Sequence, residues 1–550
     1  MKASTKRLVN LTAAVLVGLL LACSSMKEAG PPSGSPVHHL VVLHTNDTHG
    51  HPVRFFKDPA PDVGGLGARA TIVKRIRGQS KNVLVLDAGD INTGRPESNL
   101  FKARPDIEGY NYIGYDAMAI GNHEFDNALG VLREQMKLAD FPFLSANVRT
   151  KQGELLTLPY IIKEFDGFKV AIFGLTTKET EFVAHQENIR SLVFQDEVEV
   201  AKQLVPELRK QADVVIALAH MGRYNSPELG SKRLASEVNG IDLIVDGHSH
   251  TKLDAPIVMT DPESGHKTLI VQAWKWGLVL GRVDLFIQKK RVIEYKFEAI
   301  PVNLKEVEKK PDGAVVYHVI GEDIPEDPEL VRLMKPYVDK VNSLLSKVVG
   351  QAQETFFYKG VRKRETALGN LVADSMLWYT KYMEVDFALQ NGGGIRTDLP
   401  KGPITQRSMH EILPFDNSVV VLTLDGVTVR SLFDFMASIS SGQGGFPQVS
   451  AGLSITLNTL TKKYEKIMIN GEPFNPGRTY KVATNSYLAA GGDGYRMLLN
   501  ALHRYDSSAS LRDVLIKYIE HLGGTIKPHI GGRINFTDQR THSESMQKAA

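Results

Sequence analysis

The chain has 550 residues, 42% of them hydrophobic, and its 65 Lys and Arg residues exceed its 62 Asp and Glu residues by only three. A single hydrophobic core stops growing well below this length, so two domains are expected. The sequence has no long basic block and no basic residues interleaved with aromatic ones, which argues against nucleic-acid binding and leaves small anionic substrates open.

The N-terminus has the pattern of a secretory signal. Basic residues in Met1–Arg7 precede the apolar run Leu11–Leu21, and Leu20-Leu21-Ala22-Cys23 resembles the bacterial lipobox. This predicts a signal peptide over residues 1–22, cleavage before Cys23 and attachment of lipid to its sulfur. The alternatives are an ordinary secretory signal and an uncleaved anchor.

Residues 23–38 are rich in Ser, Gly and Pro and are predicted to be a flexible tether. The mature protein is then expected in the cell envelope, held to a membrane by its lipid and facing the periplasm or the cell surface. Because Cys23 is the only cysteine, no disulfide is expected.

Residues 39–327 alternate strand-like and amphipathic segments, which is the pattern of a layered α/β domain. Five short apolar runs in this region end in clusters of potential metal ligands. The clusters are His44-Thr45-Asn46-Asp47-Thr48-His49, Asp87-Ala88-Gly89-Asp90, Gly121-Asn122-His123-Glu124, Ala219-His220 and Asp246-Gly247-His248-Ser249-His250.

A single cluster of this kind is more often a turn or a strand cap than a ligand set, but five in succession indicate a metal site. Groups at the carboxyl ends of buried strands in α/β folds converge on one crevice. Carboxylate oxygens mixed with imidazoles suit divalent Mn, Zn, Co or Mg. The chain is therefore predicted to be a metalloenzyme.

The remaining chain has three parts. Residues 328–350 carry helically spaced apolar side chains and are predicted to be a linker helix, and residues 351–537 form a second, glycine-rich domain. The polar tail, residues 538–550, is predicted to be disordered. No internal repeat is evident.

Several motifs together resemble the bacterial 5′-nucleotidase and UDP-sugar hydrolase family. The first domain carries Leu43-His44-Thr45-Asn46-Asp47-Thr48-His49-Gly50, Gly121-Asn122-His123-Glu124-Phe125-Asp126-Asn127 and Gly247-His248-Ser249-His250, and the second carries Asn391-Gly392-Gly393-Gly394-Ile395-Arg396 and Gly491-Gly492-Asp493-Gly494-Tyr495. The resemblance implies a four-layer αββα calcineurin-like metallophosphoesterase domain, a linker helix and an α/β substrate-binding domain.

The same resemblance assigns the metal ligands. It implies that Asp47, His49, Asp90 and His250 bind one ion and that Asp90, Asn122, His220 and His248 bind the other, with Asp90 bridging. Two divalent ions at such a spacing can activate a hydroxide and polarise a phosphoryl oxygen. His123 and Asp126 are implied to be a catalytic dyad, in which the carboxylate orients a protonated imidazole. Asp126 could instead cap the following helix.

The second domain is implied to recognise the nucleotide. The matching substrate-binding residues are Arg362, Asn391, Arg396, Phe415, Tyr487 and Asp493. Phe415 and Tyr487 would stack on the base and Asp493 would bind the ribose. Tyr358 stands where close relatives carry a second arginine, which weakens the inference to diphosphates unless Lys359, Lys363 or Arg364 compensates.

The expected function is a monomeric, lipid-anchored 5′-nucleotidase that converts nucleoside 5′-monophosphates to nucleosides and phosphate for nucleotide salvage. Domain closure about the linker helix would bring metals and nucleoside together. UDP-sugar hydrolase and 2′,3′-cyclic phosphodiesterase activities are alternatives, although Asp126 favours the nucleotidase. A non-catalytic nucleotide-binding lipoprotein is a further alternative from a different class.

Overall fold

The structure is a computed structural model that describes residues 36–57, 60–224, 226–310, 315–458 and 460–537. The expected signal peptide, Cys23, the tether up to residue 35 and the tail lie outside the described residues. Within the described ranges, no helix is long and apolar enough to cross a bilayer.

The first domain is built on two six-stranded mixed sheets. The first sheet has the order β16 (Arg291–Pro301), β15 (Val279–Gln288), β1 (His38–Thr45), β4 (Val83–Asp87), β5 (Ala117–Ala119) and β6 (Phe143–Leu144). The second has the order β13 (Ile257–Thr260), β14 (Lys267–Val271), β12 (Leu243–Asp246), β11 (Val214–His220), β9 (Phe168–Thr176) and β8 (Tyr160–Phe165).

These sheets pack face to face because their strands are apolar on both sides. Alternate residues of β1 show the division: Leu40 and Val42 belong to the core shared by the two sheets, whereas Val41 and Leu43 belong to the core under the helices. Each fully buried aliphatic side chain of this kind contributes about 1.5–3 kcal/mol to folding. Continuous apolar runs are thus the expected sequence of strands covered on both faces.

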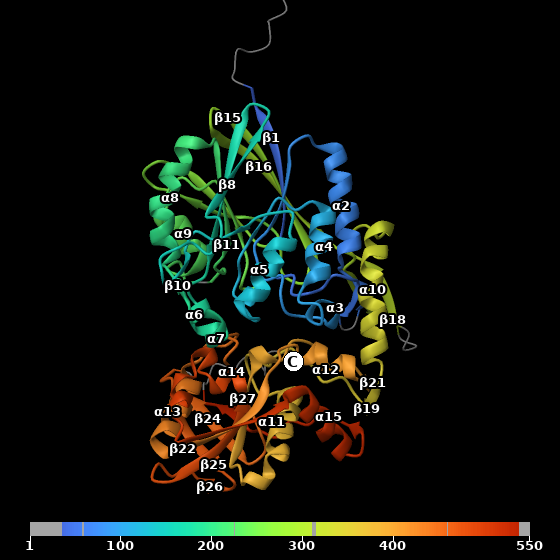
Figure 1. The fold of residues 1–550 in the computed structure, drawn as a ribbon, viewed down its shortest axis with the longest axis vertical. Coiled ribbons are helices and arrows are strands. Elements are labelled where there is room, and N and C mark those ends of the chain that lie inside the picture. Colours follow the sequence, from blue (N-terminus) through green and yellow to red (C-terminus); the bar gives the residue numbers. More distant parts are fainter. Residues whose placement is uncertain (1–35, 58–59, 225, 311–314, 459, 538–550) are drawn as a thin grey trace, which may run out of the picture.

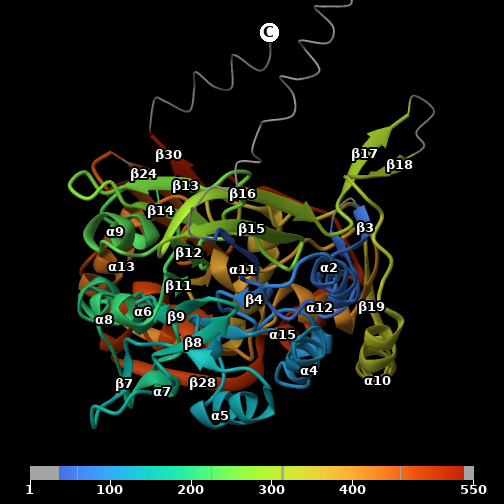
Figure 2. The same ribbon diagram turned by 90° about the horizontal axis from the view of Figure 1, so that it is seen from above.

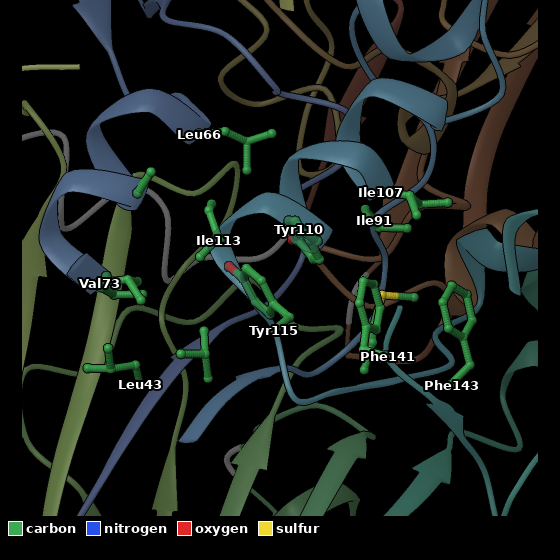
Figure 3. Close-up of a cluster of buried hydrophobic side chains, with 14 of the residues drawn as sticks. Leu43, Leu66, Val73, Ile91, Ile107, Tyr110, Ile113, Tyr115, Phe141 and Phe143 are labelled. Atoms are coloured by element: carbon green, nitrogen blue, oxygen red, sulfur yellow. The ribbon is translucent and has the colours of Figure 1, made fainter. Parts of the chain in front are cut away.

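Helices cover both outer faces and complete the predicted four layers, αββα (Figures 1 and 2). The first sheet is covered by α2 (Leu66–Gln79), α4 (Arg104–Ile113) and α5 (Leu129–Leu138), and the second by α8 (Glu197–Gln211) and α9 (Gly230–Glu237). Figure 3 shows how Leu66 and Val73 of α2 and Tyr110 of α4 gather over the first sheet. Shorter elements join these layers: β2 (Phe55–Lys57), β3 (Ala60–Val63), α3 (Pro96–Asn99), β7 (Val148–Thr150), α6 (Thr180–Val183), α7 (Gln186–Ile189), β10 (Leu192–Phe194), β17 (Lys305–Lys309) and β18 (Val315–Val319).

A single long helix, α10 (Pro328–Leu345), joins the two domains along one side of the molecule (Figure 1). It begins where the Asp327 carboxylate accepts hydrogen bonds from the Glu329 and Leu330 backbone N–H groups, with Pro328 at the first helical position. The chain then enters β19 (Val348–Ala352), which pairs with β21 (Gly402–Thr405) and β29 (Thr525–Ile526).

The second domain centres on a five-stranded sheet with the order β23 (Pro447–Val449), β20 (Phe387–Asn391), β27 (Thr479–Asn485), β22 (Ser418–Asp425) and β28 (His503–Ser510). A smaller sheet contains β26 (Glu472–Pro473), β25 (Lys463–Ile469), β24 (Leu453–Asn458) and β30 (Ile534–Phe536). The helices are α11 (Ala367–Tyr379), α12 (Gln406–Ile412), α13 (Gly426–Ser438), α14 (Ser486–Ala489) and α15 (Leu511–His521). Two separate hydrophobic cores fill this domain.

Candidate active site

The predicted metal ligands all follow the carboxyl ends of parallel strands. Pairing is parallel between β1, β4 and β5 in one sheet and between β11 and β12 in the other. The ligand positions are Asp47 and His49 after β1, Asp90 after β4, Asn122 after β5, His220 at the end of β11, and His248 and His250 after β12. The two sheets therefore deliver all of these side chains to the same edge of the domain, as the sequence predicted.

Their side chains fall into three overlapping groups with ligand atoms close enough to share an ion. The groups are Asp47, His49 and His250; His49, Asp90 and His123; and Asp90, His220 and His248. Asp90 Oδ2 lies 3.1 Å from His220 Nε2 and 3.8 Å from His49 Nε2, so this carboxylate stands between the groups.

Hydrogen bonds at the back of the imidazoles fix which nitrogen faces the site. His49 Nδ1 donates to the Asn92 carbonyl at 2.9 Å and His220 Nδ1 to the Ala88 carbonyl at 2.7 Å, since a carbonyl can only accept. When either ring is neutral, its lone pair is therefore on Nε2, which faces the site. His49 Nε2 lies 2.9 Å from His250 Nε2, and His220 Nε2 lies 3.2 Å from Asn122 Oδ1.

Acceptor atoms that face one another at these distances are stabilised by a cation between them. The donor set, imidazole nitrogens with carboxylate and amide oxygens, fits divalent cations of the kind expected from the sequence. The pKa of Asp90 illustrates the electrostatics. Burial alone would raise it, but the charges of His220 and His123 hold it well below its ordinary value.

Five of the seven predicted ligands have left-handed backbone, which is uncommon outside glycine. Their φ angles are 49° at Asp47, 43° at His49, 60° at Asp90, 74° at His248 and 50° at His250. Such conformations cost of order 1 kcal/mol each and cluster at functional sites. No pattern in the sequence predicted these left-handed conformations.

Glu124, to which the sequence assigned no role, holds two of the ligand loops in place. Its Oε2 accepts the backbone N–H groups of Asp90 at 2.9 Å and Gly121 at 2.7 Å, and its Oε1 accepts those of Ile91 and Asn92 at 3.0 and 3.2 Å. Because four backbone donors converge on one buried carboxylate, Glu124 sets the position of Asp90 relative to the Gly121 turn.

Replacing Glu124 with Gln is expected to weaken metal binding about 10- to 100-fold, because the new NH₂ group faces backbone donors and displaces the Asp90 loop. The unfolding free energy should fall by about 1–3 kcal/mol for the donors left unpaired. Titration with Mn²⁺ and thermal unfolding measure both effects. Glu134→Gln, at an exposed position on α5, is the matched control. Wild-type affinity in Glu124→Gln would contradict this role.

His123 and Asp126 lie beside the ligand cluster and form the predicted pair. His123 Nδ1 is 2.7 Å from Asp126 Oδ2, and the backbone N–H of His123 donates to Asp90 Oδ1 at 2.8 Å. Burial alone would lower the pKa of His123, but Asp126 and Asp90 raise it above its ordinary value. The arrangement favours a protonated imidazole whose remaining nitrogen is available to a bound group.

The residues predicted to bind substrate come to the same place from the second domain. A cavity of about 1270 Å³ between the domains is lined by the dyad and by Arg362, Asn391, Arg396, Phe415, Tyr487 and Asp493. Asn391 Nδ2 donates to Asp493 Oδ2 at 2.8 Å. The Tyr487 hydroxyl lies 2.9 Å from Asp493 Oδ1 and 2.8 Å from the Val183 carbonyl of the first domain.

The two domains also contact each other directly at the site. Arg396 Nη2 lies 3.3 Å from His49 Nε2, and the His123 ring stacks on Phe415 with centroids 5.8 Å apart. Beside the cavity, Arg95 pairs with Glu411 of α12 at 2.6 Å, and Arg407 of α12 pairs with Glu97 of α3. Sequence reasoning missed these ion pairs, since no local pattern relates residues so far apart.

Family comparisons define the class of protein. The calcineurin-like phosphoesterase family matches residues 40–252, and the 5′-nucleotidase C-terminal domain family matches residues 348–500. The chain is thus a metal-dependent phosphoric monoester hydrolase with a calcineurin-like catalytic domain, and the fold expected from the sequence is confirmed.

Full-length relatives narrow this class. The chain is 34% identical to protein UshA of Yersinia enterocolitica, covering 88% of this chain and 91% of the relative. It is 35% identical to a 5′-nucleotidase of Vibrio vulnificus, covering 90% and 92%. The crystal structure of a 5′-nucleotidase precursor from Thermus thermophilus superposes with a TM-score of 0.80 at 31% identity, covering 91% of this chain and 100% of that one. The chain belongs to the 5′-nucleotidase family.

Proposed function

We propose that this enzyme hydrolyses nucleoside 5′-monophosphates to nucleosides and inorganic phosphate, in the service of nucleotide salvage. The observation that carries the proposal is the single cavity lined by both the His123–Asp126 dyad and the aromatic residues Phe415 and Tyr487. A phosphoryl group beside the ligand cluster would leave its nucleoside within reach of these rings, where a base can stack.

The ligand geometry supports two divalent cations, Mn, Zn, Co or Mg, with Asp90 shared. Asp47, His49, Asp90 and His250 would hold one, and Asp90, Asn122, His220 and His248 the other. When bound, the cations supply positive charge that polarises the phosphoryl group and lowers the pKa of the attacking water.

Side chains of both domains bind and orient the phosphoryl group and the ribose. Protonated His123, oriented by Asp126, donates a hydrogen bond to charge that builds on the phosphoryl group. The guanidinium groups of Arg362 and Arg396 bind phosphate oxygens from the opposite domain. Asp493 accepts hydrogen bonds from ribose hydroxyls while Asn391 fixes its carboxylate.

Phosphate release tests the proposal. Protein lacking residues 1–23 is assayed with AMP, UDP-glucose, 2′,3′-cyclic AMP and ATP, each with Mn, Zn, Co or Mg. We expect fastest release from AMP. A preference for UDP-glucose or the cyclic nucleotide would replace the nucleotidase by that activity, and nucleotide binding with no release from any of the four would favour a non-catalytic lipoprotein.

We also propose that the enzyme is a monomer anchored at the outer membrane or another envelope membrane through lipid on Cys23. In the native bacterium, Cys23→Ser is expected to abolish incorporation of labelled palmitate and to move the protein from the membrane to the soluble fraction, because no other residue of the chain offers a thiol. Unchanged labelling in that variant would refute the assignment.

A further inference from the structure

Lys275 lies beside the candidate active site although no sequence motif marked it. It is in the connection between β14 and β15, where the Trp276 backbone N–H donates to the Asp47 carbonyl at 2.8 Å and the Trp274 N–H donates to the Thr251 carbonyl at 3.1 Å. Both tryptophans have left-handed backbone, with φ of 64° and 60°. Lys275 is therefore held between two residues that are fixed to the ligand-bearing loops after β1 and β12.

The Lys275 side chain reaches the boundary between the domains. Its Nζ lies 4.0 Å from the centroid of the Trp276 ring and 5.5 Å from that of Tyr358, which belongs to the second domain. Among the residues that the structure describes, the Lys275 ammonium has no hydrogen-bond partner and no ion pair. Burial lowers the pKa of its ammonium. Tyr358 opposes this shift, and the nearby charges of Arg362 and Arg396 add to it.

Arg362 and Arg396 share this lack of a counter-ion. Within the described part of the chain neither forms a salt bridge, and Arg362 Nε is buried without a partner. Arg396 is 9% exposed, and its contacts are His49 Nε2 and the face of Phe415. Three cations gathered without a carboxylate partner repel one another, and an anion bound among them would remove that cost.

The phenol of Tyr358 lies close to the same three cations. Burial alone would raise the pKa of its phenol, but Arg362, Lys275 and Arg396 lower it to about 8. The carboxylate on this side, Asp398, accepts the Tyr358 backbone N–H.

The residues that the sequence offered as substitutes for an arginine at position 358 are not placed for that role. Lys359, Lys363 and Arg364 are all exposed. Besides Arg362 and Arg396, the cation that lies beside Tyr358 is Lys275 of the first domain.

The neighbours of the three cations indicate which anion they would meet. Arg396 touches His49, and the segment carrying Lys275 is bonded to Asp47. Both residues belong to the metal-ligand cluster, whereas Phe415 and Tyr487 line the nucleoside side of the cavity. The anion is thus the group held at the ligand cluster.

We propose that Lys275 binds, together with Arg362 and Arg396, the phosphate group that is hydrolysed and the inorganic phosphate that is released. This inference rests on the proposed phosphomonoesterase function and adds a phosphate-binding residue from the catalytic domain. Because Arg362 and Arg396 come from the second domain, the anion is bound fully only when the domains are together.

The test compares Lys275→Met and Lys275→Arg with wild-type full-length protein and with Lys57→Met. Lys57 is the control, because it is a lysine of the same region whose Nζ lies 5.3 Å from the ring of Trp274, the residue before Lys275. The measurements are thermal stabilisation by inorganic phosphate, its inhibition constant against AMP hydrolysis, the KM for AMP and ADP, and inhibition by adenosine.

Lys275→Met is expected to weaken phosphate binding and raise the KM for AMP about tenfold, the effect of one charged hydrogen bond. Inhibition by adenosine should stay unchanged, and Lys275→Arg and Lys57→Met should bind phosphate as wild type does. If Lys275→Met unfolds early without phosphate, Lys275→Gln gives the same comparison with a polar side chain.

Wild-type phosphate binding in Lys275→Met would overturn the proposal, and so would a loss confined to ADP, which would place Lys275 on a second phosphate. Weakened adenosine binding in Lys275→Met would show that the substitution disturbs the whole cavity rather than the phosphate position, and would also overturn the proposal. Thermal stabilisation of the protein by phosphate can be measured without turnover. Failure of the nucleotidase proposal is therefore a distinct result, in which the wild-type protein does not cleave AMP.

Discussion

Replacing Asp90 with alanine is expected to lower kcat/KM for AMP by at least about 10³-fold. Loss of a single group that stabilises charge in the transition state already costs about 10²–10³-fold. Asp90 has a larger part, because its Oδ2 faces His220 Nε2 and His49 Nε2 while its Oδ1 accepts the His123 backbone N–H. If Asp90 is shared by two cations as proposed, the substitution removes a ligand from both positions and also removes the acceptor of the His123 backbone N–H.

Metal content and phosphate release measure this prediction together. Asp90→Ala should retain fewer than two ions per chain after dialysis. Asp254→Ala, which removes an exposed carboxylate paired only with Lys252, should match wild type in both assays. Two tightly bound ions with full activity in Asp90→Ala would refute the bridging role.

The second large effect is expected from His123→Ala, with kcat reduced about 10²–10³-fold and with metal content unchanged. His123 is half-buried against Phe415 and oriented by Asp126, so it can hold a proton toward the reacting phosphoryl group. The KM for AMP should change little, since the nucleoside and the metals have other ligands. Loss of metal in this variant would instead mark His123 as a ligand.

The pH profile separates the roles of the two dyad residues. In the proposed mechanism the protonated imidazole is the active form, and Asp126 raises the pKa of His123, so kcat should fall as pH rises through that pKa. Asp126→Asn removes the charge that favours protonation. Its kcat should begin to fall at a lower pH than in wild type, and an unshifted alkaline limb would contradict the pairing.

Much of the catalytic domain could be predicted from the sequence because its signals are local. Runs such as Val214–Leu218 are apolar at every position, as strands buried on both faces must be, and a predicted ligand follows each run within about four residues. Parallel pairing then converts a repeated local pattern into a single cluster of side chains. Asp90 and His220 follow strands of different sheets, so their convergence also depends on the two sheets packing face to face.

Other parts of the site depend on contacts between distant residues. Nothing in the sequence distinguishes Glu124 from other acidic residues, and only the fold shows the four backbone donors around it. Lys275 likewise resembles a surface lysine in the sequence, and only the fold places Tyr358 of the other domain beside it. The left-handed backbone at Asp47 and His250 likewise appears only in the folded structure. Such features depend on the folded structure, and the surroundings of Lys275 depend on both domains.

The two ends of α10 show the same difference between features that local sequence predicts and features that depend on distant contacts. Pro328 and the capping Asp327 mark the start of α10 in the sequence. Its end is not marked, because the apolar spacing continues to Val348, where the chain is instead recruited as β19 by pairing with β21. Long-range pairing overrides a local helical pattern there.

Stepwise restoration of metal tests the central claim of a two-cation nucleotidase most directly. Metal-stripped protein is given Mn²⁺ in increments, and the initial rate of phosphate release from AMP is measured at each step. The account predicts no release without metal and a rate that rises to a plateau at two ions per chain. A plateau at one ion per chain, or no release from AMP at any metal content, would contradict it.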